Sequence, residues 1–590
     1  MNEFRSTERQ PQRDQTCNSC EPGGVRPRTL RHRVRGLTPP GSPRLLMMKI
    51  VLGFLLVGIS SGWVEAAPPD VTSLFPAGAR RGTSTSVTIQ GKVGDGAVRV
   101  WCSRPGVKVT LPEKPGPITV DVAADAEPGV CWLRFFNDEG SSALRPFVIG
   151  TLPEINEVEP NDDWKQAQTL VETSVVVNGQ HVKGGDADSF AVALKQGQTV
   201  VASLMASRVL GSTQDAVLQV LSPEGFVLEQ NEDDQGFDPQ LAFTAPADGT
   251  YFLRTWSLPM APDSSIRLFG SPAAVYRLTV TTGPFVDRVL PLAVQAGATQ
   301  RLALRGWNMG EGVVDVEPPL SAIGQRFAWP LPGWSHRLPA SVLVVSHPTL
   351  IEQEPNDLAQ AQAVELPLSV TGHIDSPRDV DAFRFAGKKG QRLRFEVIAR
   401  DVGSPLDPVL RIYDAMGTVL KEADDDGKES ADPDIEFALP ADGEHRVAVA
   451  DRFAHHGERY VYLLKVTEVS PDFALSVVGD SFVVQSDKEL EVSVTVSRAA
   501  GFAEAIELSV VGLPEGVTVQ PAKSEPKGDS AKAVKLMLKT NGEVAFSGPI
   551  RIVGRSVGGE RSLERMAASP LKAFGAETSH LWLTLVPAKK

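Results

Sequence analysis

A long block of sequence occurs twice in this chain, and this repeat constrains the fold more than any other feature. The segment GDADSFAV at 185–192 matches RDVDAFRF at 378–385, and PADGTYFLR at 246–254 matches PADGEHRVA at 440–448. The offset between the copies drifts between 192 and 195 residues while the matching blocks stay intact. Such drift is typical of insertions and deletions in the loops of one repeated fold.

A weaker repeat precedes the first. LFPAGARRGTSTSVTIQG at 74–91 parallels VLPLAVQAGATQRLALRG at 289–306, so a pair of modules occurs twice, and the region from about 470 matches neither. Short apolar segments such as TVVASLMA and RLRFEVIA are separated by Gly, Pro, Asp and Asn, which is typical of strands joined by turns. A chain of 590 residues is too long for one hydrophobic core. We therefore predict an all-β protein, a string of β-sandwich modules that each bury their own core.

An acidic motif stands at the start of each copy, EVEPNDD at 157–163 and EQEPND at 352–357. Pro160 disfavours helix for the preceding residue, so Glu157 and Glu159 are expected in extended chain, with both carboxylates on one side and roughly 7 Å apart. Such a cluster either stays in water, with its Asn-Asp pair capping a short helical turn in the DWKQAQTL or DLAQAQAV that follows, or folds around a cation. Calcium suits it, because calcium takes roughly six to eight oxygen ligands in irregular geometry, whereas zinc would need Cys or His.

A second acidic pair supplies further oxygens about two dozen residues later. It consists of Asp186 and Asp188 in the first copy, and of Asp379 and Asp381 in the second. A Phe follows two residues after each pair, so each pair is predicted to stand at the leading edge of a core strand. The acidic motif could fold back onto it there.

The order E-x-E-P-N-D, G-(Q/H), D-x-D-x-F, G-Q, D-x-V-L and PADG, present in both copies, resembles the bacterial pre-peptidase C-terminal domain. The resemblance implies jelly-roll-like β-sandwiches of the kind attached to secreted peptidases, similar to the collagen-binding domains of clostridial collagenases. The flanking modules resemble immunoglobulin-like domains of the TIG type. We accordingly expect seven segments: an extension at 1–47, a signal peptide at 48–66, an immunoglobulin-like domain at 67–152, a pre-peptidase C-terminal domain at 153–282, a second immunoglobulin-like domain at 283–348, a second pre-peptidase C-terminal domain at 349–468, and a C-terminal immunoglobulin-like domain at 469–590.

In calcium-binding members of this family, the ligands are acidic residues of the linker and of the loop before the core strand. The resemblance therefore implies two calcium sites and no other cofactor. The first would use Glu157, Glu159, Asn161, Asp162, Asp186 and Asp188, and the second Glu352, Glu354, Asn356, Asp357, Asp379 and Asp381.

The N-terminus predicts export. Met48 and Lys49 precede the short apolar run IVLGFLLVGIS, and Val64 and Ala66 occupy the positions that a signal peptidase prefers. Cleavage would leave no stable membrane span, whereas a retained N-terminal anchor is the alternative. The Arg- and Pro-rich residues 1–47 are expected to be an unfolded extension, so their CxxC pair carries no weight. The protein is thus predicted to be secreted, periplasmic or on a bacterial cell surface.

Two cysteines remain in the predicted mature chain, and alternation points Cys102 and Cys131 toward an apolar layer. They could form a disulfide in an exported protein or stay as buried free thiols. Two further Asp-rich segments, NEDDQG at 231–236 and EADDDGKE at 422–429, are expected to be hairpin turns, with a secondary cation site as the alternative.

No catalytic residues are predicted. Gly82-Thr83-Ser84 resembles the serine motif of subtilases, but its repeat counterpart lacks the serine. HExxH does not occur. GxSxG occurs at 58–62, in the predicted signal peptide, and at 554–558, in a predicted immunoglobulin-like domain where the α/β sheet of a nucleophile elbow is not expected. The net charge of −13 argues against nucleic-acid binding and is compatible with divalent cations. We therefore expect an extracellular module that binds or scaffolds a protein or polysaccharide, with an accessory part of a secreted subtilase-type peptidase as the alternative. Candidate contact residues are Trp256, Phe453, Tyr460 and Tyr462, although such side chains more often pack inside.

Overall fold

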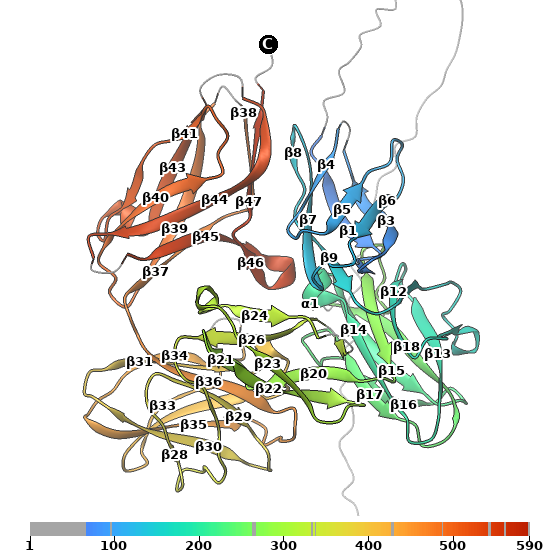
Figure 1. Ribbon diagram of the computed structural model, residues 1–590, viewed down its shortest axis with the longest axis horizontal. Coiled ribbons are helices and arrows are strands. Elements are labelled where there is room, and N and C mark those ends of the chain that lie inside the picture. The colour runs from blue at the N-terminus through green and yellow to red at the C-terminus, as the bar shows by residue number, and fades with distance from the viewer. Residues whose placement is uncertain are drawn as a thin grey trace, which may run out of the picture. The chain divides into compact units, whose positions relative to one another are not determined.

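Strands dominate the part of the chain that the computed structural model describes. This part comprises residues 67–587, apart from 95–96, 262–266, 332–333, 337, 426, 428–429, 486–487, 541–543 and 560–561. Within it, α1 (Ser207–Leu210) is the only α-helix (Figure 1), so the all-β prediction is confirmed. In the same part of the chain we find no helix with the length and hydrophobicity of a membrane span. The predicted extension and signal peptide lie outside the described residues.

The first sandwich, β10 to β19, has two five-stranded sheets with the orders β10-β12-β19-β14-β17 and β11-β13-β18-β15-β16. Alternating apolar side chains of both sheets, among them the fully buried Phe190, form one core between them. Its elements are β10 (Glu154–Asn156), the 3-10 helix η1 (Trp164–Gln166), β11 (Gln168–Thr169), β12 (Ser174–Gln180), β13 (Ala187–Leu194), β14 (Thr199–Met205), α1, β15 (Gln214–Leu221), β16 (Val227–Asn231), β17 (Gln240–Thr244), β18 (Gly249–Pro259) and β19 (Val275–Thr281).

The second sandwich, β27 to β36, repeats this topology strand for strand, with the orders β27-β29-β36-β31-β34 and β28-β30-β35-β32-β33. Phe383 takes the place of Phe190 and is also fully buried. Its elements are β27 (Leu350–Ile351), β28 (Gln362–Ala363), β29 (Leu368–His373), β30 (Val380–Gly387), β31 (Arg392–Ile398), η3 (Arg400–Val402), β32 (Pro408–Asp414), β33 (Val419–Ala423), β34 (Asp434–Ala438), β35 (Gly443–Asp451) and β36 (Val461–Glu468).

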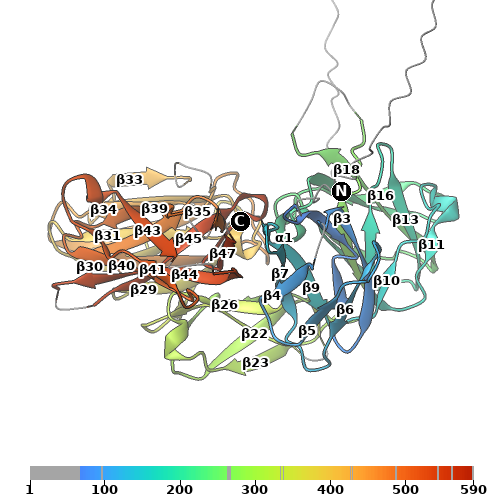
Figure 2. The same cartoon turned by 90° about the horizontal axis from the view of Figure 1, so that it is seen from above.

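Two smaller modules precede the sandwiches and share a pairing pattern. The N-terminal module (β1 to β9) pairs β1 with β3 antiparallel and β2 with β9 parallel, and the middle module (β20 to β26) does the same with β20 and β22 and with β21 and β26. Figure 2 shows the N-terminal module from above, with β5 and β6 in one sheet and β4, β7 and β9 in the other. Their elements are β1 (Asp70–Phe75), β2 (Gly78–Arg80), β3 (Ser84–Lys92), β4 (Arg99–Cys102), β5 (Val107–Thr110), β6 (Ile118–Val122), β7 (Gly129–Asn137), β8 (Gly140–Ser141), β9 (Arg145–Gly150), β20 (Phe285–Leu290), β21 (Ala293–Gln295), β22 (Gln300–Trp307), β23 (Gly312–Val316), η2 (Leu320–Ala322), β24 (Arg326–Trp329), β25 (Ser335–His336) and β26 (Ala340–Val345).

The C-terminal module, β37 to β47, joins its strands in one continuous pairing network around a separate core. The long β44 links the parts of this network, because it pairs with β40, β45 and β47 along its length. Its elements are β37 (Asp472–Val477), β38 (Ser481–Gln485), β39 (Leu490–Ala499), β40 (Ala505–Val511), β41 (Val517–Val519), β42 (Ala522–Ser524), η4 (Asp529–Ala531), β43 (Ala533–Thr540), β44 (Phe546–Val557), β45 (Glu564–Leu571), η5 (Lys572–Phe574), β46 (Ala576–Thr578) and β47 (Leu581–Val586).

The two cysteines of the N-terminal module are free thiols on the neighbouring strands β4 and β7. Cys131 is buried and Cys102 half-buried. A hydrogen bond from Cys102 lowers the pKa of Cys131 to about 7, although burial opposes this shift. Of the two alternatives, the structure therefore contains the free thiols, and the thiol groups of Cys102 and Cys131 contact each other.

The Asp-rich segments are not hairpin turns, and that prediction is wrong. The segment at 231–236 follows β16, which pairs with β15, and leads to β17, which pairs with β14 of the other sheet. The segment that starts at Glu422 likewise connects β33 to β34 across the second sandwich. The described residues of both segments therefore belong to connections that cross from one sheet to the other.

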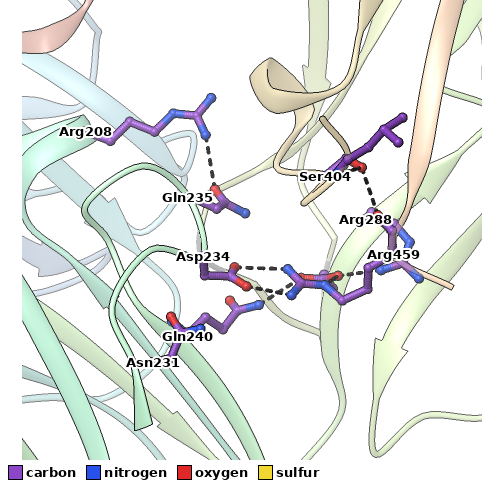
Figure 3. Close-up of polar contacts among 10 residues, drawn as sticks. Arg208, Asn231, Asp234, Gln235, Gln240, Arg288, Ser404 and Arg459 are labelled. Atoms are coloured by element: carbon purple, nitrogen blue, oxygen red, sulfur yellow. Dashed lines mark hydrogen bonds and ion pairs between the residues drawn. The ribbon is translucent and has the colours of Figure 1, made fainter. Parts of the chain in front are cut away.

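Arg459, in the loop before β36, joins three modules through its guanidinium group (Figure 3). It donates to Asp234 of the first sandwich from Nη1 at 2.6 Å and from Nη2 at 3.0 Å, and to Asp287 of β20 from Nε at 3.0 Å. The two carboxylates are only 6% and 4% exposed. Burial lowers the pKa of Arg459, but the hydrogen bonds and charges of both aspartates outweigh it and raise the pKa. The Trp307 ring lies 5.6 Å from the guanidinium carbon.

Candidate metal centres

The acidic motif of each copy lies against the leading edge of a core strand. In the first sandwich, the Ser189 amide donates to the Asn161 carbonyl at 3.1 Å, and the Ala187 amide donates to Asp162 Oδ1 at 3.3 Å. In the second, the Ala382 amide donates to the Asn356 carbonyl at 2.8 Å. These backbone contacts turn the Asn side chains inward, and both are fully buried.

A buried tyrosine bridges the two acidic segments in each sandwich. The Tyr276 hydroxyl lies 2.6 Å from Asp188 Oδ2 and 3.1 Å from Glu157 Oε2. The Tyr462 hydroxyl lies 2.7 Å from Asp381 Oδ2 and 3.4 Å from the second carboxylate, on Glu352. Because a hydroxyl has one proton, it donates fully to one carboxylate at a time. One negative charge in each pair therefore needs a proton or a cation.

Glycine makes room for this tyrosine. A Cβ on Gly179 would lie 2.2 Å from the Tyr276 ring and 2.5 Å from Glu157 Oε2. A Cβ on Gly372 would lie 2.1 Å from the Tyr462 ring. The cross-strand register explains this proximity, because each glycine stands directly opposite its tyrosine in the ladder. The G-(Q/H) motif therefore requires glycine, because any larger residue at this position would overlap the tyrosine ring.

Three carboxylates converge in each sandwich. One oxygen of each of Glu159, Asp162 and Asp186 lies within 4.8 Å of the others, and the same holds for Glu352, Glu354 and Asp381. Two oxygens bound to one calcium ion at about 2.4 Å are at most about 4.8 Å apart. Both groups are therefore compact enough to share one ion.

Buried oxygens without a hydrogen bond stand beside these carboxylates. Such atoms are rare in folded proteins, because an unpaired buried polar group costs roughly 1–3 kcal/mol. Among the described residues of the two motifs, they are Asn161 Oδ1, Asp186 Oδ1, Asp188 Oδ1, Asn356 Oδ1 and Asp381 Oδ1. Since oxygen is the ligand type that calcium prefers, the residues present fit this ion.

Burial shifts the acidity of the bridged carboxyls. Desolvation is the largest cause that raises the pKa of Glu157, Asp188, Glu352 and Asp381. Repulsion from Asp188 adds to the shift of Glu157, and repulsion from Glu352 adds to that of Asp381. A bound cation would offset both causes, because it favours the charged form.

Two predicted ligands of the second sandwich have other partners. Asp357 Oδ1 accepts from the amides of Ala359 and Gln360, both at 2.9 Å, and thus caps the short turn that follows. Asp379 closes its own loop, because Oδ2 accepts from the Asp375 amide at 2.9 Å and Oδ1 from the Val380 amide at 3.0 Å. The structure therefore brings together four of the six predicted residues most closely here: Glu352, Glu354, Asn356 and Asp381.

The helical turn predicted after each motif exists only in part. In the first copy it is η1, and its cap is Asp163, which accepts from the Lys165 amide at 3.1 Å. In the second copy the chain forms a turn without a helix, and both stretches end in short strands, β11 and β28. The buried Asn161 and Asn356 are not caps, so their side chains remain for the acidic sites.

The residues that resemble a serine protease motif do not form a catalytic group. Ser84 begins β3, is exposed and stands opposite Asp121. Among the described residues its hydroxyl makes no hydrogen bond to a histidine. His455 lies 3.7 Å from Asp451, and no cysteine or second histidine accompanies it in a metal cluster of the described residues.

Residues 186–255 match the family model of the bacterial pre-peptidase C-terminal domain. This stretch extends from Asp186 of the first acidic site to Thr255 in β18. The first sandwich is therefore a domain of this family, and the resemblance predicted from the sequence is confirmed for it.

A probable subtilase-type serine protease from Deinococcus radiodurans is 29% identical to this chain over 250 residues. The match covers 41% of this chain and 27% of that protein, so the chain spans about a quarter of this relative. The pre-peptidase C-terminal domain of a collagenase from Bacillus anthracis is 12% identical, with a TM-score of 0.15, and the match covers 18% of this chain and 93% of that one. Sidekick-1 immunoglobulin domains 1–5 are 11% identical, with a TM-score of 0.11 and coverages of 88% and 98%.

Proposed function

We propose that this chain is a secreted, calcium-stabilised β protein that works beside a peptidase by binding or scaffolding an extracellular protein or polysaccharide. The pre-peptidase C-terminal domain and the protease relative support the peptidase association. The predicted signal peptide supports export. Intrinsic protease activity is not part of this proposal, because neither candidate serine stands in a catalytic setting. Ser84 is exposed at the start of β3, and Ser556 of the GxSxG at 554–558 lies within β44, where its hydroxyl accepts from the Leu563 amide at 2.9 Å.

The calcium part of the proposal rests on the two acidic sites, because each contains buried oxygens that accept no hydrogen bond. Each sandwich combines three converging carboxylates with an inward-facing asparagine and a tyrosine-bridged carboxyl pair. Ions held there would neutralise the repulsion within each cluster. Glu159, Asp162 and Asp186 would hold the ion with Asn161 in the first sandwich, and Glu352, Glu354 and Asp381 would hold it with Asn356 in the second. The ion would supply charge neutralisation and order.

The proposed binding role rests on the repetition. Two sandwiches of the same topology in one chain can engage a repetitive ligand with avidity. Of the candidate contact aromatics, Phe453 is 63% exposed, whereas Tyr462 is buried in the second acidic site. Phe453 lies in the loop before β36 and is thus the candidate anchor that the fold leaves accessible.

Calcium is expected to raise the thermal unfolding midpoint of the sandwiches. Because the ion binds the folded state, calcium at a hundredfold its Kd adds about 2.7 kcal/mol, which is roughly 10 °C for a domain of this size. Differential scanning calorimetry of the purified chain, with millimolar calcium or with chelator, measures the shift.

The variant with both Glu159→Gln and Glu354→Gln is the matched control, because these exposed carboxylates belong to the two clusters and not to the cores. Its midpoint should respond less to calcium. Identical midpoints for the parent chain in calcium and in chelator would contradict the calcium proposal.

A further inference from the structure

The two acidic sites differ in the basic side chains that lie beside them. In the first sandwich, the Lys183 ammonium lies 3.7 Å from Asp162 Oδ2 and 3.8 Å from Asp186 Oδ1. These are two of the three carboxylates that converge there, and the third, Glu159, also contributes to the raised pKa of Lys183, after Asp162 and Asp186. A lysine thus serves as the counter-ion of the first cluster.

Among the described residues of the second sandwich we find no such counter-ion. Its loop reads His373-Ile374-Asp375-Ser376, so serine replaces the lysine and an additional carboxylate precedes it. Repulsion from Asp375 is among the causes that raise the pKa of Glu354, after burial. Arg378 is the basic residue of this loop, and within the described part of the chain it forms no ion pair with the cluster.

We propose that Lys183 competes with the divalent cation, so that the second site binds calcium more tightly and fills first. This inference rests on the proposed calcium function. A cation that enters the first site must displace the ammonium from Asp162 and Asp186 or share these oxygens with it. Entry into the second site displaces no ammonium group of the described residues, and Asp375 adds attraction. The two sandwiches would then become ordered at different calcium concentrations.

The geometry allows a clean test, because Lys183 contributes little else to the fold. Its side chain is 62% exposed, and its links to Asp186 other than the ion pair are made by the backbone: its amide donates to Oδ2 at 3.4 Å, and its carbonyl accepts from the Asp186 amide at 3.1 Å. Lys183→Ser keeps these links and copies the residue of the second loop. Ser376→Lys places the competitor in the other sandwich.

Isothermal titration of chelator-treated full-length chain with calcium chloride is expected to give two binding steps. Lys183→Ser should tighten the weaker step about tenfold and leave the tighter one unchanged, since removing a nearby unit charge acts on a divalent ion at close range. Ser376→Lys should weaken the tighter step, and Asp162→Asn should weaken the weaker step. The effect of Lys183→Ser should shrink at high salt, because exposed charges are screened.

Lys195→Ser is the matched control, since Lys195 is an exposed lysine of the same sandwich that pairs with Asp248 at 3.1 Å. It should change neither step. Two steps of equal affinity that Lys183→Ser does not alter would overturn this inference and leave the proposed function standing. A titration with no calcium binding would instead refute the proposed function itself.

Discussion

Arg459→Ala is expected to lower the free energy of unfolding by about 2 kcal/mol and to separate the melting of the two sandwiches. The substitution removes the bidentate partner of Asp234 and one of the cations beside Asp287, both of which are nearly buried. Breaking a buried pair costs about 3–5 kcal/mol, and the smaller value reflects the partial exposure of Arg459 and the retained pair of Asp287 with Arg288 at 2.6 Å. Calorimetry should resolve two transitions where the parent chain has a more cooperative one.

Arg394→Ala provides the control for Arg459. Arg394 also binds an aspartate with two nitrogens, Asp434 at 2.7 and 2.5 Å, but this pair lies on the surface of one sandwich. An exposed pair contributes about 1 kcal/mol or less, so this variant should melt almost like the parent chain. If both variants melted alike, the contacts of Arg459 would not couple the modules.

Gly372→Ala is expected to destabilise the second sandwich by about 2–3 kcal/mol and to abolish its calcium response, because overpacking forces neighbours to move. The new methyl would overlap the Tyr462 ring, which is fully buried and has no room to turn away. Displacing this ring separates its hydroxyl from Asp381 and Glu352, so the acidic site loses its shape. Calcium titration together with thermal unfolding measures both effects.

Gly310→Ala is the corresponding control, since a Cβ there meets no heavy atom within 4 Å. This variant should lie within about 0.5 kcal/mol of the parent chain. Calcium binding by the Gly372→Ala variant with unchanged affinity would show that Tyr462 does not shape the site.

The repeat allowed much of the architecture to be predicted, because matching blocks in the same order require the same topology. The D-x-D-x-F pattern predicts that Asp188 and Asp381 lie on core strands, since the following Phe must face the core. The bridging residues Tyr276 and Tyr462 were missed as site residues. Their strand reads as ordinary core alternation, and their position opposite Gly179 and Gly372 depends on long-range register. The recurring V-Y-x-L-x-V of β19 and β36, at an offset of 186, is the signal that could have revealed them.

Other features of the structure cannot be predicted from local sequence patterns. The first motif has one residue more before its short strand than the second, so the sequence does not decide whether Asp357 corresponds to Asp162 or to Asp163. The structure gives Asp357 the capping role that Asp163 has. Acidic loops look alike whether they close a hairpin or cross between sheets, and only the pairing of the flanking strands separates the two. Contacts between modules, such as that of Arg459, leave no periodic signal at all.

Strand register also determines how each sandwich would bear mechanical load. The chain enters the first sandwich at Glu154, opposite Val176, and leaves it at Thr281, opposite Ser174, so entry and exit lie at the same end of one sheet. The acidic site lies near Gln180, at the other end of the seven-residue β12, which at 3.3 Å per residue is about 20 Å from the exit opposite Ser174 and about 13 Å from the entry opposite Val176. Tension along the chain would therefore act mainly on the strands next to the entry and exit, at that end of the sheet. The candidate metal site lies outside the segment that carries this load.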